Sequence, residues 1–180
     1  PGVDGPTLQY KSANGFMDFC IIEGTRTLGG SIGIVSVDNT NFTGRNSIVI
    51  QRASAANKII ACAGGGNWYN CTFVAPDDLA TAPTYFISNS TTQNNFTNCG
   101  LFLGDSTKTI ASAPSFVAFT TCYSDISGTA GVAQATYSNE YENVNDATRD
   151  FRLKHRALQI DTGTTDSTNS PNDIIGTARP

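Results

Sequence analysis

Charged residues are scarce in this chain, and several other residue types are nearly missing. Only 14% of its 180 residues are charged, and it holds one His, one Met and one Trp. No window of 11 or more residues follows a helical apolar period, so we do not expect helices to build the fold. The formal net charge of −4 gives no overall attraction to nucleic acid. No apolar run approaches about 20 residues, so no membrane-spanning helix is predicted.

Motifs for metal, phosphate and nucleophilic chemistry are also missing from the sequence. No Cys-x-x-Cys pair occurs, and His155 has no nucleophile motif near it. The three glycines at 64–66 are not followed by the Lys-Ser/Thr of a phosphate-binding loop. We therefore expect no metal, no cofactor and no catalytic residue.

Gly, Ser, Thr and Asn are abundant, and these residues favour turns over helices. Between them lie short runs of apolar and β-branched residues that read as strands, at 31–37, 47–51, 58–62 and 85–87. The composition and this spacing together predict an all-β domain of short strands. A chain of this length can bury a core of its own.

A short motif returns along the chain with a mean spacing of about 25 residues. It consists of an apolar residue, a spacer, Asn, Cys, another spacer and a second apolar residue, and it is clearest at 67–73 and 96–101. Looser copies centre on Cys20 and Cys122, and two further copies carry Thr40 and Val144 in place of Cys. A period of this length predicts a solenoid, in which each repeat buries its apolar side against its neighbours.

Equivalent positions of a solenoid stack on one another, which predicts three interior files. The first file holds Cys20, Cys71, Cys99 and Cys122. The second holds Met17, Val37, Trp68, Phe96, Phe119 and Tyr141, and the third holds Ile22, Phe42, Phe73 and Leu101. We interpret the cysteines as reduced core residues, with one or two disulfides as the alternative. For the aromatic file, the alternative is a sugar-stacking platform.

Asn70 and Asn98 precede the cysteines of the two clearest copies. Asn tolerates the left-handed backbone region better than other residues with a Cβ atom. We therefore expect both residues to form sharp corners between successive strands.

The C-terminal third carries a family resemblance, in residues 122–131, 141–144, 150–153, 158–164 and 173–180. These stretches resemble right-handed parallel β-helix repeat proteins, of the kind found in bacteriophage virions and on bacterial surfaces. The chain departs from the family at Ala157-Leu158-Gln159, where members usually carry Ser-Pro, and after Arg179-Pro180, where members commonly continue. The resemblance implies a single-stranded, right-handed parallel β-helix. With the repeat, it predicts a lead-in or cap over 1–15, about six to seven rungs over 16–146 and a capping segment over 147–180.

The leading functional hypothesis is a non-enzymatic virion structural protein, such as a bacteriophage capsid-decoration, tail or fibre component. Its expected partners are other virion proteins or further copies of itself. One alternative is a protein that binds or degrades polysaccharide, either tailspike-like or secreted, and another is a bacterial surface adhesin. A hydrolase needs two carboxylates about 5–10 Å apart. The candidate contacts for a glycan or a partner are Asp77, Asp105, Asp125 and Arg152.

Overall fold

The computed structural model describes residues 8–11, 14–24, 35–38, 41–51, 59–62, 64–75, 85–89, 92–102, 109–111, 114–143 and 150–154. Strands dominate these residues, with one short α-helix and one 3₁₀-helix, so the expected all-β class is confirmed. Sixteen of the described strands belong to three parallel sheets, and two form a separate antiparallel pair.

The strands are short, and their bounds follow sheet by sheet. Sheet A contains β1 (Leu8–Tyr10), β4 (Val35–Val37), β7 (Ile60–Cys62), β10 (Tyr85–Asn89) and β13 (Thr109–Ala111). Sheet B contains β2 (Phe16–Asp18), β5 (Phe42–Arg45), β8 (Gly66–Tyr69), β11 (Asn94–Thr97) and β14 (Val117–Thr120). Sheet C contains β3 (Ile21–Gly24), β6 (Ile48–Gln51), β9 (Thr72–Val74), β12 (Gly100–Phe102), β15 (Cys122–Ser124) and β16 (Val132–Gln134). The remaining elements are η1 (Pro114–Phe116), α1 (Tyr137–Glu140), β17 (Tyr141–Asn143) and β18 (Asp150–Leu153).

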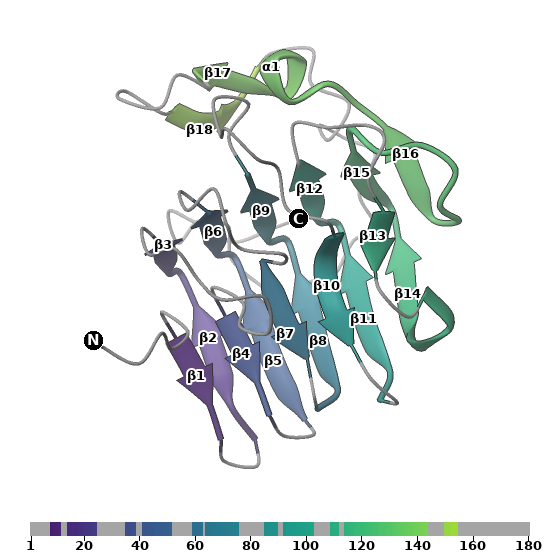
Figure 1. Cartoon of the computed structure of the whole chain (residues 1–180). Helices are drawn as coiled ribbons and strands as arrows, with labels where there is room; N and C mark the ends of the chain where they lie inside the picture. Colours follow the sequence, from purple (N-terminus) through teal and green to yellow (C-terminus); the bar gives the residue numbers. More distant parts are fainter. Residues whose placement is uncertain are drawn as a thin grey trace, which may run out of the picture.

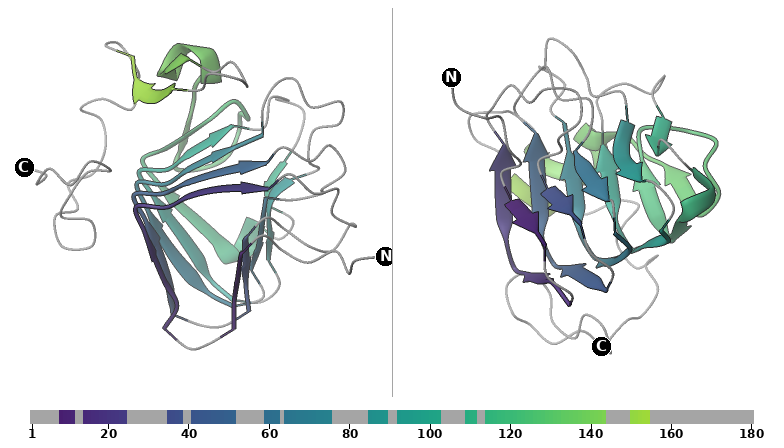
Figure 2. Two further views of the ribbon diagram at one scale, coloured as in Figure 1. Left: turned by 90° about the vertical axis from the view of Figure 1, so that its left-hand side faces the viewer. Right: turned by 60° about the horizontal axis from the view of Figure 1, so that its bottom comes forward.

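The chain visits the three sheets in a fixed order. It passes from sheet A to B to C and then begins again, so each strand pairs in parallel with the strand three places later. The three sheets form the walls of a three-sided prism whose strands stack along its axis (Figures 1 and 2). In sheet B, Phe16 pairs with Thr43, Phe42 with Gly66, and Asn94 with both Gly66 and Val117. The observed repeat therefore varies between 23 and 28 residues, around the predicted period.

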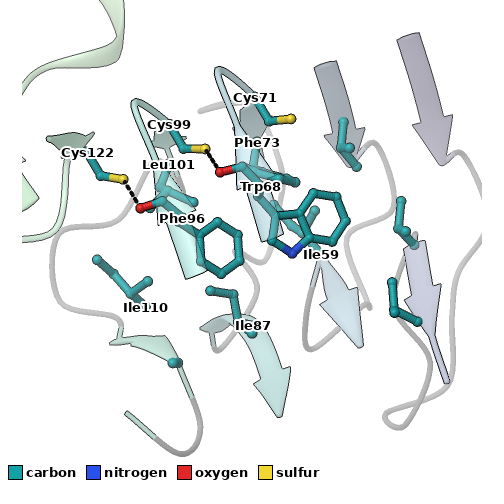
Figure 3. Close-up of a cluster of buried hydrophobic side chains, with 14 of the residues drawn as sticks. Ile59, Trp68, Cys71, Phe73, Ile87, Phe96, Cys99, Leu101, Ile110 and Cys122 are labelled. Atoms are coloured by element: carbon teal, nitrogen blue, oxygen red, sulfur yellow. Dashed lines mark hydrogen bonds between the residues drawn. The ribbon is translucent and has the colours of Figure 1, made fainter. Parts of the chain in front are cut away.

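The inward file of sheet B explains both its large and its small residues. The register aligns Met17, Gly44, Trp68, Phe96 and Phe119. A Cβ atom on Gly44 would lie 2.5 Å from Cε3 of Trp68, so the indole occupies the space that a side chain at 44 would need. The rings of Trp68 and Phe96 are stacked, with centroids 5.9 Å apart and planes 5° apart (Figure 3).

The second repeat lies seven residues later than we expected. Pairing of Asp18 with Arg45 and of Ile21 with Ile48 places Ser47, not Thr40, beside Cys20. Val37 belongs to sheet A, and Phe42 belongs to sheet B. The place predicted for Phe42 in sheet C is taken by Val49, between Ile22 and Phe73. The expected files were therefore wrong at Val37, Thr40 and Phe42.

The parallel stack ends earlier than the sixth motif copy predicts. Pairing of Cys122 with Val132 spans only ten residues, so the chain reaches β16 without visiting sheets A and B again. Tyr141 then lies in β17, which pairs antiparallel with β18, and not in the aromatic file of sheet B. Val144 lies outside the described residues. At the other end, β1 already pairs with β4 inside the 1–15 segment that we expected to lead into the stack.

The α1–β17–β18 segment packs on the outer side of sheet C (Figure 1). Tyr141 is buried in a cluster with Val74, Phe102, Tyr123 and Ala135. Its ring meets Phe102 edge-on at 5.8 Å, and its hydroxyl lies 3.1 Å from Oγ1 of Thr72. This segment therefore covers a side wall of the stack, in addition to any role in closing its end.

Candidate interaction surface

A left-handed residue turns the chain from sheet B to sheet C in every repeat. The five equivalent residues, all with φ between +49° and +54°, are Phe19, Asn46, Asn70, Asn98 and Thr121. Nδ2 of Asn98 donates to Oδ1 of Asn70 at 3.3 Å, and the Thr121 hydroxyl donates to Oδ1 of Asn98. The corners expected at Asn70 and Asn98 are present, and Asn46 forms another. Because the corner is sharp, the side chains before it face outward and inward in strict alternation.

A small hydrogen-bond donor follows each corner and closes it. The thiols of Cys20, Cys71, Cys99 and Cys122 and the hydroxyl of Ser47 each donate to the carbonyl oxygen two residues earlier, at 2.7–3.5 Å. Cys99 and Cys122 also donate across the stack to the carbonyl oxygens of Trp68 and Phe96 (Figure 3). The four described cysteines are free thiols. Burial raises the pKa of the Cys99 thiol, which keeps it protonated and unreactive.

The outward face of sheet B carries two columns of mostly polar side chains. The first column is Phe16, Thr43, Asn67, Asn95 and Ala118. The second column is Asp18, Arg45, Tyr69, Thr97 and Thr120. None of the ten residues is buried, in contrast to the inward residues that alternate with most of them. Adjacent members of a column lie about 4.8 Å apart, because that is the spacing of paired strands.

Two contacts hold this face in a fixed arrangement. Nδ2 of Asn95 donates to Oδ1 of Asn67 at 2.9 Å, so the two amides form a ladder along the column. Nε of Arg45 lies 2.8 Å from Oδ2 of Asp18, and its guanidinium stacks over the Phe16 ring at 4.5 Å. The face therefore offers amides, hydroxyls and aromatic rings, and its one ion pair is satisfied internally.

The outward face of sheet C differs in chemistry and in cover. Ile48, Ile50, Val74 and Phe102 point outward there and are nonetheless buried. Because Tyr141 and its neighbours pack on part of this wall, it offers less free surface to a partner than sheet B. Sheet B is the wall with a described, accessible and ordered outer face.

The candidate contacts predicted from the sequence do not gather on this face. Asp77 and Asp105 lie outside the described residues. Asp125 follows β15, where its Oδ1 lies 3.4 Å from the Ser124 hydroxyl, and Arg152 is exposed in β18. The prediction from the sequence did not include four polar residues of the outward face: Thr43, Asn67, Tyr69 and Asn95. Their signal was the alternation of each with an inward apolar residue or with Gly44.

Within the described residues, His, Cys, Asp and Glu do not form groups of three that could hold a metal ion. The same residues contain no helix that is long and apolar enough to cross a membrane. Comparisons with protein-family models, curated proteins and solved structures find no match to this chain.

Proposed function

We propose that this chain is a right-handed parallel β-helix that serves as a non-enzymatic structural protein of a virus particle. On this proposal it is a capsid-decoration, tail or fibre component of a bacteriophage. The in-register stacking of five turns carries the proposal, because continuous backbone pairing along one axis makes a stiff module. The resemblance of residues 122–131 and 158–164 to phage β-helix domains supports the location.

Electron microscopy with immunogold labelling tests this location. Antibodies against the recombinant chain are applied to purified particles and to the particle-free supernatant of the same culture. We expect label at a fixed position on intact particles. Label that stays in the supernatant, with none on particles, would contradict the proposal.

The outward face of sheet B favours a second candidate function, the binding of a neutral polysaccharide. Amides and hydroxyls form hydrogen bonds with sugar hydroxyl groups, and an aromatic ring such as Tyr69 can pack against the apolar face of a sugar. The Asn67–Asn95 ladder is already ordered, so binding would cost little side-chain entropy. The Asp18–Arg45 pair leaves little free charge on the face, which favours an uncharged ligand over an acidic one.

A glycan array, followed by calorimetry on any ligand found, tests this second function. The double variant Asn67→Ala/Asn95→Ala is expected to weaken binding at least about tenfold, since two amide partners are lost. Asn139→Ala is the matched control, because this exposed Asn lies in α1, away from sheet B. Equal binding by the double variant and the control would show that sheet B is not the glycan site.

A further inference from the structure

The first turn of the stack exposes a compact set of apolar side chains. Phe16 is 50% exposed, Phe19 43% and Ile21 67%. In the part of the chain that the structure describes, the one other large apolar residue with comparable exposure is Leu153 in β18. The three residues flank the corner between sheets B and C, within six positions of the sequence. We call this set, with strands β2 and β3, the first-turn edge.

The backbone of the first-turn edge is open on one side. Among the described strands, β2 pairs only with β5 and β3 pairs only with β6, since both end their sheets. Proteins usually protect such edges with Lys, Pro or a bulge, because unpaired strands add other strands. Here the outward residues Phe16 and Ile21 are apolar. The edge therefore has the backbone groups and the side chains to add another strand.

The opposite end of the stack is closed by the chain itself. The segment after β15 turns back across it, and the amide of Cys122 donates to the carbonyl oxygen of Gly131 at 3.0 Å. Gly131 passes so close to β14 that a Cβ atom there would lie 2.0 Å from the carbonyl oxygen of Phe119. Ile126, from the same segment, is buried against the core. This cover obstructs head-to-tail stacking of identical copies, which would need both ends open.

The charges at the first-turn edge suit contact with an identical edge. Asp18 accepts hydrogen bonds from Arg45 at 2.8 Å and from Asn46 at 3.0 Å, so its carboxylate is neutralised within the molecule. Arg45 is held in turn over the Phe16 ring. Two such edges can approach without repulsion between their Asp18 carboxylates. Apolar residues near the contact then supply the attraction.

We propose that the first-turn edge binds a second copy of this chain, with the two first turns facing each other across a twofold axis. The β3 strands pair antiparallel and extend sheet C into the partner copy. Phe19 and Ile21 lose solvent contact on both sides of the axis. The proposal goes beyond the function given above, because it uses the edge of the stack and not the outward face of sheet B.

Sedimentation of the full chain over a range of concentrations tests the dimer. We expect a reversible monomer–dimer equilibrium that Ile21→Lys weakens at least about thirtyfold, because each subunit places a charge in the apolar contact. Leu153→Lys is the matched control, since it puts the same charge at the other exposed apolar residue, and it should leave the equilibrium unchanged. Circular dichroism of both variants verifies that they remain folded. A wild-type chain that stays monomeric at its highest soluble concentration overturns the proposal.

Photocrosslinking tests the orientation of the two copies. A photoreactive phenylalanine replaces Phe19 in one variant and Thr120, an exposed residue of the fifth turn, in another. The variant at position 19 should give a covalent dimer, and the variant at position 120 should remain monomeric on a denaturing gel. Crosslinking at position 120, or a dimer that Ile21→Lys does not affect, would overturn the face-to-face arrangement.

Discussion

The two ends of the stack solve the same problem in different ways. At the fifth turn, residues 125–135 fold back, place Ile126 against the core and lead into the final parallel strand. At the first turn, the described residues leave the β2 and β3 edges open, with Phe16, Phe19 and Ile21 exposed. A stack of turns is stable only where its last apolar layer is covered. Within the described residues, one end is therefore covered by the chain itself, and the other is left open to contact.

The largest expected effect comes from Gly131, which allows the closing segment to lie against β14. Its φ is +77°, and an added Cβ would meet a backbone oxygen that cannot move away easily. We expect Gly131→Ala to lower the free energy of unfolding by about 3 kcal/mol or more. Gly128→Ala is a close control, because Gly128 has φ +83° with no atom near its Cβ position. That variant should lose only about 1 kcal/mol in urea unfolding. Equal losses would show that the close approach at Gly131 is unimportant.

The two isoleucines at the ends provide the next comparison. Ile126 is 4% exposed and Ile21 is 67% exposed. Ile126→Ala should cost about 2–4 kcal/mol by leaving a cavity under the closing segment. Ile21→Ala should change the stability of the dilute monomer by no more than about 0.5 kcal/mol. Thermal and urea unfolding of both variants measure these values. A small loss at Ile126 would mean that another group closes this end.

Thiol labelling distinguishes the ends by their local stability. Cys20 is partly buried in the first turn, whereas Cys99 is fully buried, with a pKa raised by burial. Labelling of Cys20 requires opening of one terminal turn, but labelling of Cys99 requires the stack to unfold. In a Cys62→Ser background, we expect iodoacetamide to modify Cys20 at least about a hundredfold faster at pH 8. Mass spectrometry of peptides gives both rates. Similar rates would indicate that the stack opens as one unit.

Strong local signals in the sequence predicted the regular middle of the stack. Trp68, Phe96 and their following Asn-Cys pairs carry both the inward alternation and the corner, and the structure places them in one register. The second turn was misplaced because Gly44 and Ser47 replace the expected aromatic residue and cysteine. Gly44 is small because Trp68 of the next turn fills its space, and this relation cannot be seen within one repeat. Ser47 replaces the thiol with a hydroxyl that makes the same hydrogen bond.

The ends were harder to predict than the middle, because each depends on contacts between distant residues. The closing segment shortens the repeat to ten residues between Cys122 and Val132, and no periodic pattern announces that change. Tyr141 matched the motif by its spacing to Asn143. In the structure it packs instead on Phe102 and Thr72, about 40 and 70 residues earlier. The outward face of sheet B was overlooked because we searched for carboxylates and not for alternating amides.

The smallest expected effect concerns the corner residue of the first turn. Phe19 adopts φ +52°, a conformation that costs a bulky residue about 1–2 kcal/mol and that Asn tolerates better. Asn occupies this corner in the next three turns, so Phe19→Asn should stabilise the dilute monomer by about 0.5–1 kcal/mol. The same variant should weaken the proposed dimer, because it removes an apolar contact. Thr121→Asn, at the corner of the closed end, should give a similar gain in stability and leave the dimer unchanged. If Phe19→Asn failed to stabilise the monomer, the Phe19 ring would have to contribute contacts within the chain that offset its backbone strain.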